Sequence, residues 1–361
     1  MTPSFTCPRF TDDLYVPASN GNSVGVLESH DGGDSTEYDS GVGATVEAAI
    51  LMATGANGED GSVVVGGLAG AGYSLDHGAT WAKLGGLRSP AVITQDIKYE
   101  AGSGLWALTG SFLGVSGIAS SPSADTNFTV TQGPQMLIEN ELRYGSLPTK
   151  DTWYVTAGFW GDDGVDMEPG FRRVSKGLAL GPKGEAVNLL KAPVGIVTGT
   201  PAGSRVGSSF AWGQVAKTVD AGRTWSLVFN DTDSGLYPND ISCFDARTCV
   251  FVLDASGTDL PARIMSTVDG GASWETFETT GEPGDGLMAA RMVGPTEAWV
   301  SGGNEVGEMW HTTDLVHWDV QTVEVTDAAS IFSFALIPDG SGIYATGILR
   351  SQLCSVLKID F

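Results

Sequence analysis

The stretch TVDGGASW, from Thr267 to Trp274, decides how this sequence is divided, because near copies of it recur along the chain. TVDAGRTW runs from Thr218 to Trp225, and SLDHGATW runs from Ser74 to Trp81. The shared pattern is Ser or Thr, any residue, Asp, any residue, Gly, any residue, Ser or Thr, and Trp. Three full matches to this octet in 361 residues indicate an internal repeat.

Weaker copies extend the repeat. TTDLVHW (Thr312–Trp318) keeps the hydroxyl, the acid and the Trp, whereas SPSADTNF (Ser121–Phe128) loses the Asp and the Gly. The third positions of the five copies are Asp76, Ser123, Asp220, Asp269 and Asp314. They are separated by 47, 97, 49 and 45 residues. Because 97 is about two periods, we expect one further unit without a readable octet, centred near Arg172.

Each unit has the pattern of four short strands. Between residues 240 and 280, DISCF, CVFVLD, ARIMST and WETFET are rich in β-branched and aromatic residues, and the octet joins the last two. Four-stranded units at a period of 45 to 49 residues are typical of a β-propeller, in which antiparallel sheets called blades surround a channel. After Trp318, SIFSFALI, SGIYATGIL and CSVLKIDF read as three strands that lack a fourth.

We therefore expect an all-β, single-domain, seven-bladed β-propeller over residues 1–361, whose last blade is closed by the N- and C-terminal strands. Residues 41–361 would form six blades and three strands of the seventh, residues 2–12 the closing strand, and residues 16–40 an acidic loop. Six or eight blades are the alternatives. Eight is favoured if SHDGGDST, from Ser29 to Thr36, is a vestigial unit rather than part of that loop.

The residue types of the octet are those that a tight turn between antiparallel strands requires. The Gly tolerates positive φ, the Asp can accept several exposed amides, and the Trp can pack its apolar face beside the hairpin. The chain resembles the Asp-box (BNR) repeat family of β-propellers, in which the octet is a structural hairpin at the blade periphery, away from the ligand-binding face. The resemblance therefore implies a structural role for Asp76, Gly78, Trp81, Asp220, Gly222, Trp225, Asp269, Gly271, Trp274, Asp314 and Trp318.

Charge and hydropathy exclude some partners. The net charge of −24, from 43 acidic and 19 basic residues, repels a polyanion, so we expect no nucleic-acid partner. The sequence contains no run of about 18 apolar residues, so we expect no membrane span. The start, MTPSFTCPRF, lacks the pattern of a secretory leader, so we expect either a cytosolic protein or a mature form without its leader.

The four cysteines, Cys7, Cys243, Cys249 and Cys354, form no CxxC pair. In ISCFDARTCVFVLD, Cys243 and Cys249 flank the turn between the first two strands of a unit. This resembles a subgroup of Asp-box repeats from bacterial surface and secreted proteins in which these two strands are joined by a disulfide. Ring closure by the termini would bring Cys7 beside Cys354. Two such bonds favour a secreted or extracellular location, and four buried thiols in a cytoplasmic or organellar protein are the alternative.

Propellers usually bind ligands at one end of the channel, where the innermost strands converge, and the first strand of each unit should be innermost. Arginines beside tyrosines and an acid can bind a carboxylated sugar, and a Trp can stack on a sugar ring. The candidate ligand-binding residues are Tyr99, Glu100, Arg143, Tyr144, Trp160 and Arg291.

A candidate calcium site lies in FWGDDGVDMEPG, residues 159–170, where four carboxylates occur within seven positions. The residues are Asp162, Asp163, Asp166 and Glu168. A solvated acidic loop is the alternative.

These features favour a secreted or surface propeller that binds a glycan or a protein at the channel mouth without catalysing a reaction. Sialidases and xyloglucan-hydrolysing propellers also carry Asp boxes, so the resemblance leaves a sialidase-like glycoside hydrolase as an alternative, although no catalytic set can be assembled. A protein-complex assembly factor is the third possibility, because the units resemble those of photosystem II assembly propellers.

Overall fold

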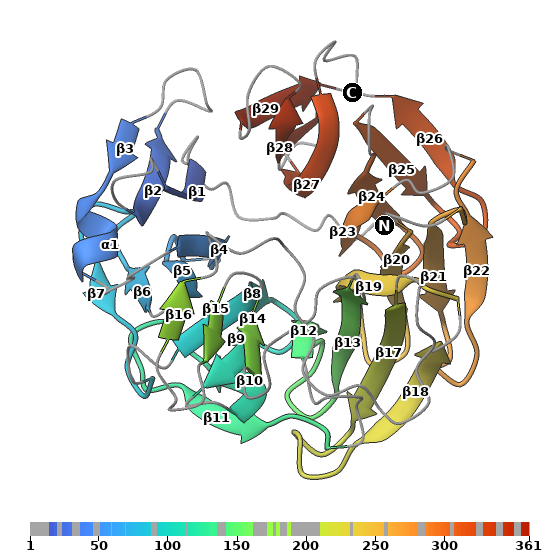
Figure 1. Cartoon of the computed structure of the whole chain (residues 1–361), viewed down its shortest axis with the longest axis horizontal. Helices are drawn as coiled ribbons and strands as arrows, with labels where there is room; N and C mark the ends of the chain where they lie inside the picture. Colours follow the sequence, from blue (N-terminus) through green and yellow to red (C-terminus); the bar gives the residue numbers. More distant parts are fainter. Residues whose placement is uncertain are drawn as a thin grey trace, which may run out of the picture.

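The computed structural model describes residues 14–19, 24–30, 37–45, 51–58, 60–68, 70–87, 92–112, 115–135, 142–161, 172–175, 178–180, 186–188, 210–231, 234–255, 259–280, 286–303, 307–322, 328–336, 342–349 and 355–360. Antiparallel sheets follow one another around a ring (Figure 1). The one helix among these residues is the short α1 (Gly41–Thr45). In this part of the chain, no helix has the length and apolar character to cross a membrane.

The first half of the ring is built from strands that follow one another in the sequence. One sheet holds β1 (Leu14–Ser19), β2 (Val24–Ser29) and β3 (Glu37–Asp39). The next four strands are β4 (Leu51–Asn57), β5 (Val63–Leu68), β6 (Ala71–Ser74) and β7 (Ala82–Lys83). They are followed by β8 (Val92–Glu100), β9 (Leu105–Phe112), β10 (Val115–Ser121) and β11 (Thr129–Gln132). A single pair, Leu68↔Ile93, joins these two groups of four.

The second half continues in the same way, with one interruption. The next sheet holds β12 (Leu142–Ser146), β13 (Trp153–Gly161), β17 (Phe210–Thr218) and β18 (Ser226–Asp231). It is followed by β19 (Tyr237–Cys243), β20 (Cys249–Asp254), β21 (Arg263–Thr267) and β22 (Glu275–Glu278). Then come β23 (Leu287–Met292), β24 (Ala298–Gly302), β25 (Glu308–Thr312) and β26 (Asp319–Thr322). The last sheet holds β27 (Ala328–Leu336), β28 (Gly342–Leu349) and β29 (Ser355–Asp360).

Strands β1, β4, β8, β12, β19, β23 and β27 contact one another in this order and lie toward the inside of the ring (Figure 1). We call them the inner strands. Apolar residues of neighbouring sheets form the core between the blades. The largest cluster includes Tyr154, Phe251, Ile264 and Trp310, which come from four strands of three successive sheets.

In the described residues, the unit expected near Arg172 does not form a four-stranded sheet of its own. β14 (Arg172–Ser175), β15 (Leu178–Leu180) and β16 (Ala186–Asn188) form a separate three-stranded sheet. This segment is inserted between β13 and β17, which pair directly with each other from Trp153↔Thr218 to Gly161↔Phe210. The expectation was wrong because the spacing of the octets is the same for an extra unit and for an insertion of about one period within a unit. The described part of residues 41–361 therefore contains one four-stranded blade fewer than we expected.

The expected acidic loop at residues 16–40 contains strands β1, β2 and β3, which pair in sequence order. The interpretation as a loop was wrong because it relied on the acidic residues, whereas VGVLES carries the β-branched pattern of a strand. SHDGGDST lies between β2 and β3. Its first residue, Ser29, is buried, as are the first residues of the full octets, such as Ser74 and Thr267.

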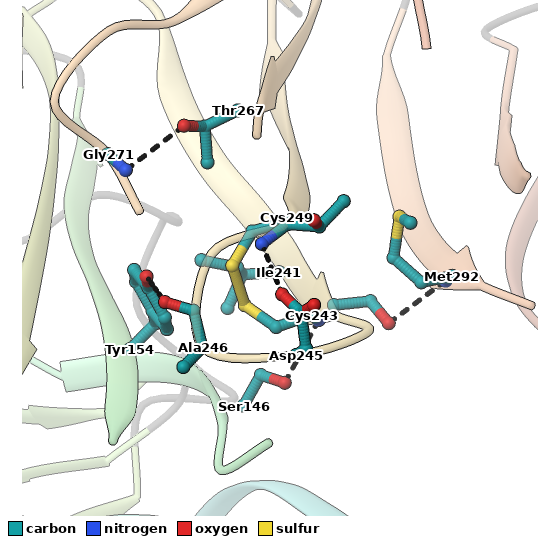
Figure 2. The surroundings of a disulfide bond; sticks show 12 residues. Ser146, Tyr154, Ile241, Cys243, Asp245, Ala246, Cys249, Thr267, Gly271 and Met292 are labelled. Carbon is teal, nitrogen blue, oxygen red and sulfur yellow. Dashed lines mark hydrogen bonds between the residues drawn. A yellow bond between two sulfur atoms is a disulfide. The ribbon is translucent and has the colours of Figure 1, made fainter. Parts of the chain in front are cut away.

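The octets lie between the third and fourth strands of their sheets, as the sequence predicted. Asp269 Oδ1 accepts hydrogen bonds from Thr267 Oγ1 at 2.8 Å and from the Ser273 N–H at 3.0 Å, and Oδ2 accepts one from Ser273 Oγ at 2.6 Å. Thr267 Oγ1 accepts the Gly271 N–H at 3.0 Å (Figure 2). The corresponding bonds surround Asp76 and Asp220. The carboxylate thus satisfies the donors that the tight turn exposes.

These donors favour the ionised carboxylate. The Thr224 hydroxyl and amide, followed by the Thr218 hydroxyl, lower the pKa of Asp220 to about 2. The pKa of Asp269 is also lowered, first by the Ser273 hydroxyl, and that of Asp314 is lowered, first by the His317 side chain.

The octet turn uses two left-handed residues. In TVDAGRTW these are Ala221 (φ 56°) and Gly222 (φ 83°). The fifth position also approaches the preceding sheet closely. A Cβ on Gly222 would clash with Thr131 Cγ2 of β11, and one on Gly271 would lie 2.9 Å from Val228 Cβ of β18. Gly is therefore required both for its backbone conformation and for this contact.

The Trp of the octet completes the contact with the preceding sheet. Trp274 Nε1 donates a hydrogen bond to the Val228 carbonyl at 2.9 Å. Val228 lies at a register shift between β17 and β18, and such an extra residue leaves its backbone groups outside the ladder. The Trp274 ring meets Phe251 edge-on, with centroids 4.8 Å apart.

The predicted bond between Cys243 and Cys249 is confirmed. The two residues face each other across β19 and β20 and form a buried disulfide (Figure 2). Within their turn, the Ala246 carbonyl accepts hydrogen bonds from the Tyr154 hydroxyl at 2.7 Å and from Lys217 Nζ at 3.3 Å, which ties this blade to the preceding one. Cys7 and Cys354 lie outside the described residues.

Replacing Asp269 by Ala should lower the melting temperature by a few degrees, because three donors in the turn lose their acceptor. The matched control is Glu275→Ala, which removes a neighbouring exposed carboxylate from β22 and should leave the melting temperature nearly unchanged. Thermal unfolding followed by circular dichroism measures both. Equal melting temperatures for the two variants would contradict the structural role of the octet.

Acid should weaken the fold through the octet carboxylates. Since the folded pKa of Asp220 is about 2 and the unfolded value is about 4, its stabilisation is present above about pH 4 and is lost as the pH falls toward 2. Denaturant unfolding at several pH values should show the stability gap between wild type and Asp220→Asn closing over this window. A gap that stays constant down to about pH 2 would rule this linkage out.

Candidate functional site

Each inner strand from β4 to β27 carries an irregularity in its pairing with the second strand. The register shifts lie at Met52/Thr54, Thr94/Asp96, Leu142/Gly145, Pro238/Asp240, Leu287/Ala289 and Ala328/Ser330. A bulge inserts one extra residue and re-aims the side chains that follow it. The bulges therefore give equivalent positions on successive inner strands.

Side-chain oxygens of one inner strand accept hydrogen bonds from backbone N–H groups of the next inner strand or, for Leu147, of the residue directly after it. The pairs are Ile97 N–H with Thr54 Oγ1 (3.1 Å), Gly145 N–H with Asp96 Oδ2 (3.5 Å), Leu147 N–H with Glu100 Oε1 (3.1 Å), Cys243 N–H with Ser146 Oγ (3.1 Å), Ala290 N–H with Asp240 Oδ2 (3.0 Å) and Met292 N–H with Ser242 Oγ (3.0 Å). These bonds satisfy amides at the inner edges and join successive blades.

Three long side chains depart from this pattern. Tyr144 lies two residues after Leu142, the last paired residue before the bulge of β12. In β8 and β19 the residue at this position is an Asp. Lys98 and Arg291 lie four residues after the last paired residue before their bulges. In β12 and β19 the residue at this position is a Ser. A local departure from an otherwise regular structural rule is typical of a functional site.

Lys98 is the centre of the polar cluster. Its Nζ donates to Asp240 Oδ1 at 2.6 Å and to the Ile241 carbonyl at 2.6 Å, and it pairs with Asp96 Oδ2 at 3.2 Å. The side chain therefore runs from β8 past β12 to β19. Burial alone would lower the pKa of Lys98, but Asp240 and Asp96 more than offset this and raise it, so the ammonium stays charged. Burial raises the pKa of Asp96.

A second part of the cluster combines an arginine with two tyrosines. The Arg143 guanidinium lies 5.7 Å from the ring centre of Tyr144 and 5.2 Å from that of Tyr237. The Tyr237 hydroxyl and Asn239 Nδ2 both donate to Asp254 Oδ2 at 2.7 Å. Burial raises the pKa of Tyr144, so its phenol is neutral and can donate or accept a hydrogen bond.

The sequence-predicted ligand residues are only partly brought together. Arg143 and Tyr144 lie side by side on β12, and Arg291 lies on β23. Tyr99 packs against Trp106 within its own blade, with ring centroids 5.2 Å apart. Glu100 accepts bonds from Ser146 Oγ at 2.7 Å and from a backbone amide of β12's sheet, so it links blades.

Trp160 lies on β13 rather than on an inner strand, and its side chain is outside the described part of the structure. The four carboxylates of the candidate calcium site, Asp162, Asp163, Asp166 and Glu168, also lie outside the described residues. Within the described ranges, no three His, Cys, Asp or Glu side chains are grouped in a way that could hold a metal ion.

Lys98, Asp96 and Asp240 were not predicted as site residues from the sequence. The available signal was the presence of charged residues inside segments, DIKYE and NDISC, that otherwise read as buried strands, because a buried charge requires a partner. The partnership itself joins residues 142 positions apart.

No protein-family model matches the sequence, and no curated protein matches it. The structure is similar to that of YCF48 bound to D1 peptide, with 12% sequence identity and a TM-score of 0.54, over 97% of this chain and 88% of the other. YCF48 from Cyanidioschyzon merolae is similar with 11% identity and a TM-score of 0.54, over 97% of this chain and 91% of the other. Together with the ring of antiparallel sheets, this likeness to β-propellers shows that the chain has a β-propeller fold.

Proposed function

We propose that this chain is a protein-binding propeller that holds a segment of a partner protein against the inner strands β8, β12, β19 and β23. The observation that carries the proposal is the replacement of short inner-strand side chains by Lys98, Tyr144 and Arg291. A structure of the similar propeller YCF48 is described as bound to a D1 peptide, which supports a peptide as the kind of ligand.

The chemistry of the cluster suits a peptide. Arginine and tyrosine side chains can donate hydrogen bonds to main-chain carbonyls, and the tyrosine rings offer apolar faces to side chains of the partner. Because the chain carries a net charge of −24, its long-range field attracts a basic segment and repels an acidic one. We therefore expect the bound segment to be basic.

The octets are proposed to be Asp boxes, and the ring to be a seven-bladed propeller in which residues 2–12 add a strand to the three-stranded β27–β29 sheet. Among the described residues, seven groups of strands form the ring, apart from the inserted β14–β16 sheet, and the first and last of the seven have three described strands each. Cys354 directly precedes β29, so a Cys7–Cys354 bond would fix the added strand beside it. The Cys243–Cys249 disulfide supports a secreted or surface location.

A random-peptide library displayed on phage should yield basic peptides that bind the immobilised protein. A selected peptide, measured by fluorescence anisotropy, should bind Tyr144→Ala and Arg291→Ala at least about tenfold more weakly. Tyr and Arg are enriched among the few interface residues whose truncation costs about 2 kcal/mol or more, and about 1.4 kcal/mol is tenfold in affinity. The matched control is Arg223→Ala, which removes an exposed arginine from an octet turn.

Two results would contradict this function. One is a library that yields no peptide that binds this protein more strongly than it binds an unrelated acidic protein. The other is an affinity that depends on Arg223 as much as on Tyr144. Binding of sialosides or plant glucans to the same variants, in place of peptides, would favour the glycan-binding interpretation instead.

Thiol titration tests the closure and the location. The unfolded, unreduced protein should show no free thiol, and four thiols should appear after reduction. Two free thiols before reduction would argue against a Cys7–Cys354 bond, and four would argue against an oxidising compartment.

A further inference from the structure

We propose that Lys98 is a positioning residue, whose ammonium group fixes four inner strands relative to one another and thereby sets where Tyr144 and Arg291 lie. The consequence for ligand binding rests on the proposed function. The physical role of Lys98 does not depend on any ligand, and the experiments below separate the two.

The ammonium group of Lys98 is fully used. It has three N–H donors, and three oxygens surround it: Asp240 Oδ1, the Ile241 carbonyl and Asp96 Oδ2. Lys98 is 6% exposed, so water competes little for these bonds. The acceptors come from β8 and β19, which belong to different blades with the β12 blade between them.

Each of the two carboxylates also accepts a hydrogen bond from a further strand. Asp96 Oδ2 accepts the Gly145 N–H of β12 at 3.5 Å, and Asp240 Oδ2 accepts the Ala290 N–H of β23 at 3.0 Å. One ammonium group thus connects β8 and β19 directly, and β12 and β23 through one carboxylate each. We call this arrangement the Lys98 hub.

The two amides held by the Lys98 hub are next to the proposed contact residues. Gly145 directly follows Tyr144, and Ala290 directly precedes Arg291. A peptide unit fixed at one residue restricts the backbone of its neighbour. The hub therefore restricts the backbone at Tyr144 directly, through the peptide unit that Tyr144 shares with Gly145, and at Arg291 through the residue before it.

Without the ammonium group, the two carboxylates would face each other in a poorly solvated site. The charged and titratable groups around Lys98 are Asp96 and Glu100 on β8, Arg143 and Tyr144 on β12, Asp240 on β19 and Arg291 on β23. Lys98 offsets part of the rise that burial causes in the pKa of Asp96, so without the ammonium group the pKa of Asp96 would rise further.

The first test is the pH dependence of stability of the full-length Lys98→Met variant. A carboxyl whose folded pKa is raised contributes stability at low pH that is lost as the pH rises through the raised pKa. The melting temperature of the variant should therefore fall further below that of wild type between about pH 4 and pH 8. Lys217→Met is the matched control, because Lys217 Nζ bonds only the Ala246 and Gly270 carbonyls among its described hydrogen bonds. The difference in melting temperature between wild type and Lys217→Met should not grow with pH.

The second test is amide hydrogen exchange, which reports on positioning. In Lys98→Met, the Gly145 and Ala290 amides should exchange at least about tenfold faster than in wild type. The Cys243 amide, held by Ser146 Oγ outside the hub, should keep its rate. Lys98→Arg restores a cation and should recover most of the protection, as well as the affinity for a selected peptide.

If Lys98→Met does not fold, the double variant Lys98→Met/Asp240→Asn removes one negative charge while keeping an oxygen for the Ala290 amide. It should fold without the growing deficit at high pH. Unchanged exchange at Gly145 and Ala290, or a deficit that is equal at low and high pH, would overturn the proposal. If these changes occur while wild type binds no peptide, the hub stands and the proposed function fails.

Discussion

Every sheet in this protein has two edges, and the fold depends on satisfying the backbone polar groups at both of them. At the outer edge, the octet of one blade packs against the fourth strand of the preceding blade, with Gly271 against Val228 and Trp274 bonded to the Val228 carbonyl. At the inner edge, side-chain oxygens of one strand accept the amides of the next. The blade of β19–β22 is therefore held to the preceding blade at both edges by side-chain contacts, without a backbone ladder between the two sheets.

The elements that repeat could be predicted from the sequence, because repetition reveals which residues serve local geometry. The octet, its place between the third and fourth strands, and the Cys243–Cys249 pair follow from patterns within about fifty residues. The unit expected near Arg172 and the loop expected at residues 16–40 failed for opposite reasons. In the first, spacing was taken to mean a blade where it reflects an insertion, and in the second, charge was given more weight than the β-branched pattern of VGVLES.

The candidate site was predicted less well, because the contacts of its residues depend on the register and order of the strands. Arg143 and Tyr144 were found as an arginine next to a tyrosine, and they are neighbours in space. Lys98 was not found, because its partner Asp240 is 142 positions away and lies two blades further along the ring. Removing one partner of a buried ion pair typically costs about 3–5 kcal/mol, so the cluster constrains the fold as well as any ligand. Sequence reasoning identifies charged residues in buried strands but not the pairs they form.

The insertion between β13 and β17 shows that the length of a repeat and the integrity of a blade are separable. The two strands pair along their whole length, from Trp153↔Thr218 to Gly161↔Phe210, although 48 residues intervene between them. These residues enter and leave the blade at the end opposite the octets, because the octet turn and the turn between the first two strands share the other end, where the Ala221 N–H bonds the Asp151 carbonyl at 2.9 Å. The ring thus carries an inserted segment at one of its faces while β13 and β17 stay paired along their whole length. Variation in length on that face is a route by which such a protein can acquire new surfaces while its architecture stays constant.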